Sequence, residues 1–390
     1  MCLMKTHQTE ETGARTAIGR ARRIVIKVGS QVLVQNSGRP ETQRLKSLAH
    51  EMAELSGQKR EVAFVTSGAI GTGMQALGMK RRPADLPGLQ MAAAVGQSRL
   101  MNEYDRLFAA EKKIIGQVLL THDDLKHRAR HVNAKNTIMT MLRKGVIPVI
   151  NENDVVAVDE IKFGDNDLLA ALVVQLIKAD LLIMLSSTDG LYRPLPDGRR
   201  ERIGYLNEVS GDVFKLARGK GGDISTGGMA SKLEFARLAA ETAGAFVVIA
   251  DGRTEGIIGK IMSGADTGTL IVPAKKTSLG ALDDRKRWIA FFHKPKGALI
   301  IDEGACRALE HGGKSLLPIG VKKIEGEFPA GAMVNVKALD GRLVARGLTE
   351  YSSREVEIIR GRRTEEIIRL LGGKREDELI HRDNLALMTE

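Results

Sequence analysis

Three glycine-rich stretches of the sequence contain the residue types that bind phosphate groups. The first places Lys27 within the apolar run IVIKV, which Gly29 follows, and the second is VTSGAIGTG at 65–73. The third, STGGMASK at 225–232, combines hydroxyls, small residues and Lys232 at the start of a helical pattern. Small residues expose backbone N–H groups to an anion, and lysines neutralise its charge. None of the three has the P-loop spacing GxxxxGK[ST], so a snorkelling lysine, a tight turn and a flexible surface loop are the alternative interpretations.

Two polar clusters follow the apolar run that ends at Ile150. Asn151-Glu152-Asn153-Asp154 comes directly after it, and Gly164-Asp165-Asn166-Asp167 comes ten residues later, before an apolar helical pattern. Asp165 could cap that helix, because Asp is favoured at the N-cap, but one cap needs one such residue. Amide groups bind polar atoms and carboxylates bind ammonium groups. The two clusters therefore favour recognition of a polar, charged substrate.

Together, the lysines and the glycine-rich turns predict phosphoryl transfer. This chemistry depends on positioning and on positive charge beside the transferred group more than on covalent catalysis. Lys27 and Lys232 would supply that charge at the β- and γ-phosphates, with Mg²⁺ bridging the phosphates. The sequence has no His/Cys cluster typical of a zinc site and no Gly-x-Ser-x-Gly motif typical of a serine hydrolase. We assign no residue as a metal ligand.

The elements that must position these residues alternate between short apolar runs and longer amphipathic segments. The runs predict strands buried on both faces of a mostly parallel sheet, and the segments predict helices that cover it. In such α/β folds, ligands bind beyond the carboxyl ends of the strands, where the turns and polar clusters lie. The expected strands are 24–28, 62–66, 114–120, 146–150, 181–185, 246–250 and 269–272, and the expected helices are 42–56, 89–112, 129–144, 166–178 and 230–243.

The pattern changes near residue 275, which predicts a second domain. A chain of 390 residues is long for one domain, and residues 276–284 are typical of a polar linker. Short runs punctuated by Gly and Pro follow at 288–292, 298–301, 320–324, 332–337 and 343–348, and they predict a small β-domain. We therefore expect domains at 20–275 and 285–365, joined by a linker at 276–284.

The composition limits the class of protein. Hydrophobic residues make up 43%, which excludes a disordered chain, and no apolar run approaches the ~18 residues that cross a bilayer. The N-terminus lacks the apolar core of a signal peptide, so we expect a cytoplasmic protein. Cys2 and Cys306 exclude a framework of several disulfides. The net charge of +11 suggests an anionic partner without identifying it, and residues 281–390 contribute only +2 of it.

These motifs resemble the amino acid kinase family. The matching stretches, in the family's order, are IVIKVGS, VTSGAIGTG, AAAVGQSRL, PVINENDVV, KFGDNDLLAA and STGGMASKLE, and the stretches RKRWIAFF, GALIIDEGACRAL, SLLPIGV and ARGLTEYSS resemble the PUA domain. The resemblance covers about residues 20–365 and implies a three-layer αβα sandwich with a mostly parallel open sheet, followed by a small β-barrel-like PUA domain. The glycine-rich pieces alone also fit acetylglutamate, aspartate, carbamate or uridylate kinases. INEND followed by GDND, with a PUA domain behind, favours the members that phosphorylate L-glutamate.

The resemblance also implies roles for single residues. Lys27 and Lys232 would contact the transferring phosphate, and Asp167 would organise these lysines, since a carboxylate nucleophile is already ionised at pH 7. Ser67, Asp154 and Asn166 match glutamate-binding positions, and Gly68, Asn151 and Asp165 lie nearby. Nucleotide contacts are expected from Lys27, Gly29, Ser186, Ser187, Thr226, Gly227, Gly228, Met229, Ala230, Ser231 and Lys232. Ser186 and Ser187 stand where the family commonly has Thr-Asp; Ser186 keeps the hydroxyl, and Ser187 departs from the pattern.

The implied activity is transfer of a phosphoryl group from ATP to the γ-carboxylate of L-glutamate, the first step of proline synthesis. The resemblance further implies Mg²⁺, feedback inhibition by L-proline and a homo-oligomer, with no membrane partner. Two alternatives are another acceptor within the family and RNA binding through the PUA domain. Specific RNA binding needs a basic surface and stacking aromatics. Residues 281–390 carry few aromatics, and Trp288, Phe291 and Phe292 lie in a strand pattern typical of a core. We therefore expect the PUA domain to serve assembly or regulation rather than RNA binding.

Overall fold

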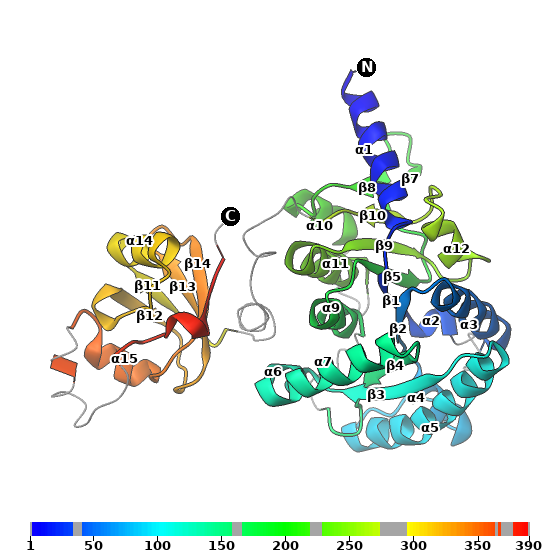
Figure 1. Cartoon of the computed structure of the whole chain (residues 1–390), viewed down its shortest axis with the longest axis horizontal. Coiled ribbons are helices and arrows are strands. Elements are labelled where there is room, and N and C mark those ends of the chain that lie inside the picture. The colour runs from blue at the N-terminus through cyan, green and yellow to red at the C-terminus, as the bar shows by residue number, and fades with distance from the viewer. Residues whose placement is uncertain are drawn as a thin grey trace. The chain divides into compact units, whose positions relative to one another are not determined.

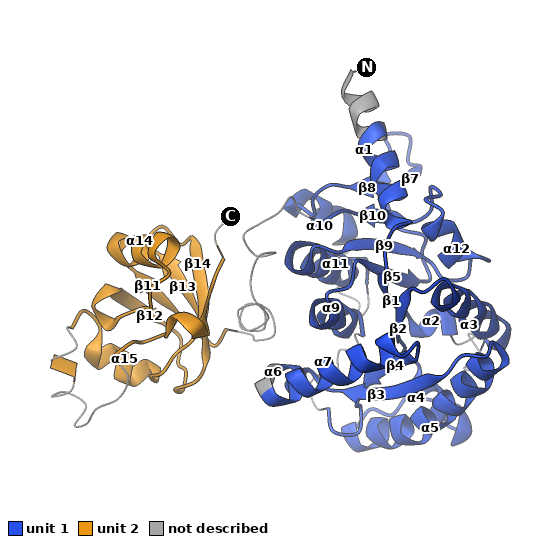
Figure 2. Cartoon of the chain, viewed as in Figure 1, with its two compact units in different colours: residues 1–274 blue, residues 275–390 orange. Residues whose placement is uncertain are grey.

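The apolar runs of the first 275 residues form the strands of one large sheet in the computed structural model (Figure 1). The structure describes residues 2–33, 41–157, 166–218, 228–273, 295–362, 366–367 and 377–388. It divides into two compact units, Met1–Ala274 and Lys275–Glu390 (Figure 2). The expected linker at 276–284 lies outside the described residues, so the domain limits given above stay predictions.

The sheet of the first unit is mostly parallel, as predicted. Its strand order is β3-β4-β2-β1-β5-β9-β10-β8, and the antiparallel pair among the described strands is β9 with β10. The central strands β1 and β5 have buried side chains on both faces, which explains their unbroken apolar sequences, whereas edge strand β3 is half-exposed. The strands are β1 Arg23–Val28, β2 Glu61–Val65, β3 Ile115–Leu120, β4 Ile147–Glu152, β5 Leu181–Ser186, β8 Tyr205–Leu206, β9 Phe246–Asp251 and β10 Thr269–Ile271.

Helices cover both faces of this sheet and complete three layers (Figure 1). Helices α3, α5 and α12 share one apolar core with β1, β2 and β5, and α7, α9 and α11 lie on the other face. The helices are α1 Cys2–Ile18, α2 Ser30–Leu33, α3 Thr42–Gly57, α4 Ala69–Ala76, α5 Leu86–Ala110, α6 His122–Lys126, α7 Arg128–Arg143, α9 Asn166–Ile177, α10 Gly211–Arg218, α11 Met229–Ala243 and α12 Ile257–Met262. Among the described residues, no helix is long and apolar enough to cross a membrane.

Two differences from the predicted elements have local causes. Helix α5 begins at Leu86 rather than at Leu89, because the Asp85 side chain caps the N–H of Gly88 and Pro87 fits the first turn. The polar hairpin of β6 Leu191–Pro194 and β7 Arg200–Ile203 was not predicted, because its exposed strands lack an apolar run.

The second unit contains a five-stranded sheet in the order β12-β11-β13-β14-β15. Its pairs are antiparallel except for β11 with β13. Phe328 and Tyr351 lie in its apolar core rather than on the surface, while the run predicted as a strand at 288–292 lies outside the described residues. The elements are β11 Gly297–Ile301, α14 Glu303–Gly312, η2 Pro318–Gly320, β12 Val321–Glu325, β13 Met333–Ala338, β14 Leu343–Leu348, α15 Ser353–Ile359, η3 Arg382–Asn384 and β15 Leu385–Leu387.

Candidate active site

A buried aspartate holds two lysines that are far apart in the sequence. Lys232 Nζ lies 2.8 Å from Oδ2 of Asp167, and Lys27 forms an ion pair with Oδ1 of the same carboxylate. Asp167 is fully buried and Lys27 is 5% exposed. Burial alone would raise the pKa of Asp167, but the two ammonium groups outweigh it and hold that pKa below its ordinary value. The carboxylate is therefore ionised at neutral pH.

The three charges meet because their elements end at the same edge of the sheet. Lys27 lies near the carboxyl end of β1, between Val65 of β2 and Met184 of β5. Asp167 is the second residue of α9, and Lys232 lies in the first turns of α11. Two ammonium groups and one carboxylate thus meet in a largely buried place. Such a site favours an anion between the lysines.

Lys27, Asp167 and Lys232 are called the lysine triad below. Residues of the polar clusters predicted for substrate recognition form a connected set of hydrogen bonds beside it. The amide of Asn166 donates to Thr66 O at 2.6 Å, to Ser67 Oγ at 3.0 Å and to Asn151 Oδ1 at 2.9 Å. Asn151, at the end of β4, donates in turn to Gln97 Oε1 at 2.7 Å. Since Asn166 directly precedes Asp167, this set and the lysine triad are joined through the start of α9.

Gly68 begins helix α4 in a conformation that favours glycine. Its φ of 102° lies in the left-handed region, where side chains with a Cβ are strained. The turn from β2 into α4 therefore depends on this glycine. It places the Ser67 hydroxyl beside the amide of Asn166.

Gln97 was not predicted as a site residue, although it lies in the stretch AAAVGQSRL. Helices α4 and α5 approach backbone to backbone: a Cβ on Gly73 would lie 1.7 Å from Ala92 O, and a Cβ on Gly96 would lie 1.8 Å from Ala69 O. This close crossing brings Gln97 to Asn151. Gly96 beside a polar side chain in an apolar helical pattern was the signal that could have indicated this contact.

Tyr104 anchors the same face of α5 seven residues after Gln97, which is two helical turns. Its hydroxyl is hydrogen-bonded to Thr66 Oγ1, and its ring packs edge-on against Phe64. Burial raises the pKa of Tyr104, so this phenol stays neutral. The long helix is thus fixed to the end of β2 next to the polar set.

Asp154 lies in the turn after β4, and the structure does not place it in the hydrogen-bonded set of Asn151 and Asn166. Burial raises the pKa of Asp154 to about 6, and the positive charge of Arg82 opposes that shift. Lys80, Arg81 and Arg82 are exposed, and Arg82 is close enough to act on this carboxylate. Asp165, the third acidic residue predicted here, lies outside the described residues.

Gly29, Ser186 and Ser187, which were predicted to contact a nucleotide, lie on the β5 side of the same edge. Gly29 N donates to Leu185 O at 2.9 Å, which joins the turn after β1 to the end of β5. Ser186, the last residue of β5, is 7% exposed and lies 3.3 Å from Thr188 Oγ1. Ser187 donates from Oγ to Gln31 Oε1 at 2.6 Å, and its carbonyl accepts from Arg253 at 2.6 Å.

The glycine-rich loop before α11 is described in part. Gly228 is the N-cap of α11, and Ser231 Oγ donates to its carbonyl at 2.9 Å. Met229, Ala230 and Lys232 follow in the first turns of the helix. Thr226 and Gly227 lie outside the described residues. The described part places the N-terminus of α11, which favours anions, next to the charge of Lys232.

Among the residues that the structure describes, no group of three or more His, Cys, Asp or Glu side chains could hold a metal ion. Asp167, the buried carboxylate of the site, is paired with two lysines. Such a donor set does not fit a resident Mg²⁺, which usually binds carboxylates together with substrate phosphates.

Comparison with known proteins gives two family matches and close relatives. Residues 22–251 match the amino acid kinase family, and residues 297–371 match the PUA domain. The glutamate 5-kinase of Geobacter sp. (strain M21) is 46% identical over 371 residues, 95% of this chain and 98% of that protein. The glutamate 5-kinase of Caldanaerobacter subterraneus subsp. tengcongensis is 45% identical over 368 residues, 94% of this chain and 98% of that protein. Among solved structures, the UMP kinase from Bacillus anthracis aligns with a TM-score of 0.45 and 17% identity, over 65% of this chain and 97% of that one.

Proposed function

The chain belongs to the amino acid kinase family, and from this premise we propose that it transfers the γ-phosphoryl group of ATP to the γ-carboxylate of L-glutamate. The products are ADP and L-glutamyl 5-phosphate, and the reaction begins proline synthesis. The observation that carries the proposal is the pairing of Lys27 and Lys232 on Asp167, directly next to the hydrogen-bonded Asn166. Relatives that are 46% identical over 95% of the chain are named for this activity.

The two lysines stabilise the transferred phosphoryl group. In phosphoryl transfer, negative charge spreads over the equatorial oxygens, and fixed cations lower the barrier. Asp167 holds the ammonium groups of Lys27 and Lys232 on one carboxylate, so their positions are set before the substrates bind. Asp167 is an organising group rather than a base, since the attacking carboxylate of glutamate is ionised at pH 7.

The polar set beside the triad recognises glutamate. Ser67, Asn151 and Asn166 supply a hydroxyl and amides for the carboxylates of the substrate, while Gly68 opens the turn at which Ser67 lies. The Asp154 carboxylate, when it is ionised, pairs with the ammonium group of glutamate. Asp165 is proposed to act beside Asp154. Gln97 positions Asn151 through the bond between their side chains.

ATP binds on the side of β5 and α11. Gly29 lets the phosphates approach the end of β1, and Ser186 and Ser187 face the nucleotide from the end of β5. The loop Thr226–Lys232 wraps the phosphates with backbone N–H groups, hydroxyls and Lys232. Mg²⁺ enters together with ATP, as part of the nucleotide substrate.

Three further features of the account are proposed on the family resemblance. They are feedback inhibition by L-proline at the glutamate site, a homo-oligomeric assembly and a cytoplasmic location. The limits of the kinase domain at 20–275 and of the PUA domain at 285–365 are proposed in the same way.

The choice of acceptor tests the proposed function. The protein is incubated with ATP, Mg²⁺ and hydroxylamine together with L-glutamate, N-acetylglutamate or L-aspartate, and the acyl hydroxamate is measured. Acyl phosphates react with hydroxylamine, so the signal reports carboxylate phosphorylation. We expect product with L-glutamate. Product with one of the other acceptors alone would contradict the proposal and assign the chain to a different reaction of the same family.

A further inference from the structure

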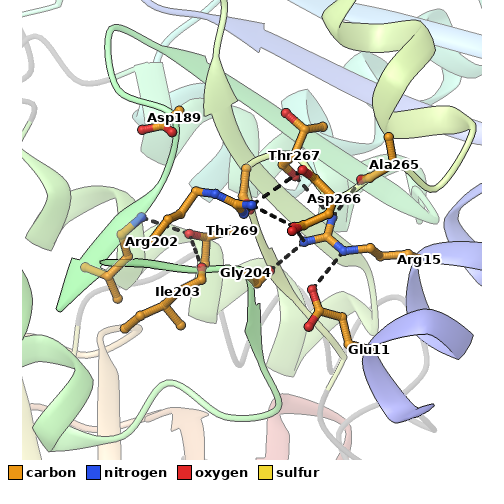
Figure 3. A network of polar contacts seen from close by, with 12 residues as sticks. Glu11, Arg15, Asp189, Arg202, Ile203, Gly204, Ala265, Asp266, Thr267 and Thr269 are labelled. Carbon is orange, nitrogen blue, oxygen red and sulfur yellow. Dashed lines mark hydrogen bonds and ion pairs between the residues drawn. The ribbon is translucent and has the colours of Figure 1, made fainter. Parts of the chain in front are cut away.

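Helix α1 precedes residues 22–251, which match the kinase family, and its Arg15 is buried. Arg15 is 5% exposed, and all five N–H groups of its guanidinium have an acceptor (Figure 3). A guanidinium carries five N–H donors in one rigid plane. When all five donate hydrogen bonds, they fix the positions of the acceptor groups around it. The acceptors are Glu11 Oε1 at 2.9 Å, Ala265 O and Thr267 O at 3.1 Å, Gly204 O at 2.9 Å and Asp266 Oδ1 at 3.0 Å.

Asp266 joins this arginine to a second one. Its Oδ1 also accepts from Arg202 Nη2 at 2.7 Å, and Arg202 Nη1 donates to Gly268 O. Figure 3 shows Arg15 and Arg202 converging on Asp266 from different elements. Because Arg202 belongs to β7, one carboxylate connects α1 to the β6–β7 hairpin.

Thr269 connects the same segment to both strands of the hairpin. This fully buried residue donates from Oγ1 to Ile203 O at 2.7 Å and accepts from Leu191 N at 2.8 Å. The backbone at Gly190 lies close to the Thr269 side chain, because a Cβ on Gly190 would lie 2.5 Å from Thr269 Oγ1. Leu191 follows the turn 186–190 at the end of β5, so this turn is held at its far end by Thr269.

We propose that Arg15 is a positioning residue for ATP, acting through Asp266, Arg202 and Thr269 on the turn that carries Ser186 and Ser187. The inference rests on the proposed function, which places ATP beside that turn. The described contacts of this network end on the hairpin and on residues 265–269, and they do not include the lysine triad or the polar set around Asn166. Loss of Arg15 therefore weakens ATP binding and spares glutamate binding and the chemical step.

The test compares Arg15→Met and Thr269→Val with the unaltered protein in the glutamate-dependent hydroxamate assay. Arg15→Met removes the guanidinium and its hydrogen bonds. Thr269→Val keeps the shape of the buried side chain and removes both hydrogen bonds of its hydroxyl. Each should raise KM for ATP by at least about fivefold, since net loss of one hydrogen bond has this size, and should leave KM for glutamate and kcat within about twofold. Arg15→Lys keeps the charge with three donors, so its KM for ATP should lie between those of the unaltered protein and Arg15→Met.

Arg60→Met is the matched control. Arg60 also ties the segment after α1, by donating to Ala21 O at 2.7 Å and to Gly19 O at 2.9 Å, but on the side of β2. It should lower the thermal midpoint without raising KM for ATP. Circular dichroism establishes that each variant is folded at the assay temperature, and if Arg15→Met is not, Thr269→Val decides the test.

Two results would overturn the inference in a folded, active protein. One is an unchanged KM for ATP in Thr269→Val, or in a folded Arg15→Met. The other is an equal rise of KM for ATP and KM for glutamate in Arg15→Met or Thr269→Val, or a rise of KM for ATP in Arg60→Met that matches theirs. Either would assign Arg15 to general stability. Absence of glutamate-dependent product from the unaltered protein would instead contradict the proposed function itself.

Discussion

Lys232 Nζ lies 2.8 Å from Oδ2 of Asp167, a carboxylate with no exposed surface. Lys27 approaches the other oxygen of the same group from the central strand β1. One buried anion thus fixes two cations that come from opposite ends of the first unit's sequence. Two ammonium groups held in place in this way can stabilise an anion, and the proposed reaction supplies one in the γ-phosphate of ATP.

Replacing Asp167 by Asn tests whether the carboxylate organises the lysines. The amide keeps the shape but removes the negative charge that pairs with both ammonium groups. We expect kcat to fall by at least about 10²-fold and the free energy of unfolding to fall by about 3 kcal/mol. Steady-state kinetics and urea unfolding measure the two effects.

Asp180→Asn is the control for that substitution. Asp180 also accepts hydrogen bonds, from Arg22 N and Arg23 N, but it lies at the opposite end of β1 and is exposed. Its kcat should match that of the unaltered protein. An Asp167→Asn variant with kcat within about tenfold of normal would show that the lysines do not depend on this carboxylate.

The raised pKa of Asp154 predicts a pH dependence of glutamate binding. Burial raises this pKa to about 6, and Arg82 opposes the shift. Because the ionised form pairs with the substrate ammonium, kcat/KM for glutamate should rise with pH and level off above about 6. The effect on folding has the opposite sign: a carboxyl with a raised pKa stabilises the fold at low pH, and this contribution is lost as the pH rises through about 6.

Two substitutions identify Asp154 as the group responsible. Asp154→Asn should remove the inflection, and Arg82→Ala should move it to higher pH, since the opposing positive charge is gone. The corresponding profile for ATP should lack this inflection. Persistence of the inflection in Asp154→Asn would assign it to another group.

The close crossing of α4 and α5 predicts a sensitive position at Gly96. A Cβ there would lie 1.8 Å from the carbonyl of Ala69, so the helices must separate. Gly96→Ala should lower the free energy of unfolding by about 2 kcal/mol and, by displacing Gln97, raise KM for glutamate. Thermal unfolding and kinetics check both.

Gly211→Ala is the comparison for Gly96→Ala, because a Cβ on Gly211 at the start of α10 meets nothing within 4 Å. It should leave stability and both Michaelis constants near normal. If the two alanine variants behaved alike, the contact between α4 and α5 would not be what positions Gln97.

Features that depend on where the parallel strands end could be predicted from the sequence. The apolar runs around Lys27, Ile150 and Leu185 predicted buried parallel strands, and the polar residues after them do meet at one edge of the sheet. Parallel strands bring their carboxyl ends together, so residues that follow them become neighbours whatever their distance in the chain.

Features set by contacts between helices could not be predicted in this way. Gln97 reaches Asn151 because two glycines let α4 and α5 touch, and Arg15 is fixed by three carbonyls from two segments, Gly204 and the turn with Ala265 and Thr267. Neither the contact of Gln97 nor the contacts of Arg15 produce a recognisable residue pattern in the sequence. Asp154 was predicted to bind glutamate together with Ser67 and Asn166, and this role stays a prediction; burial raises its pKa and the positive charge of Arg82 opposes the shift.

The most direct measurement is kcat for glutamate-dependent hydroxamate formation by Lys232→Ala beside the unaltered protein, with saturating ATP and glutamate. If Lys232 stabilises the transferring phosphoryl group, kcat falls by at least about 10²-fold, while the variant stays folded. A folded Lys232→Ala variant that turned over at the normal rate would contradict the central role of the lysine pair on Asp167.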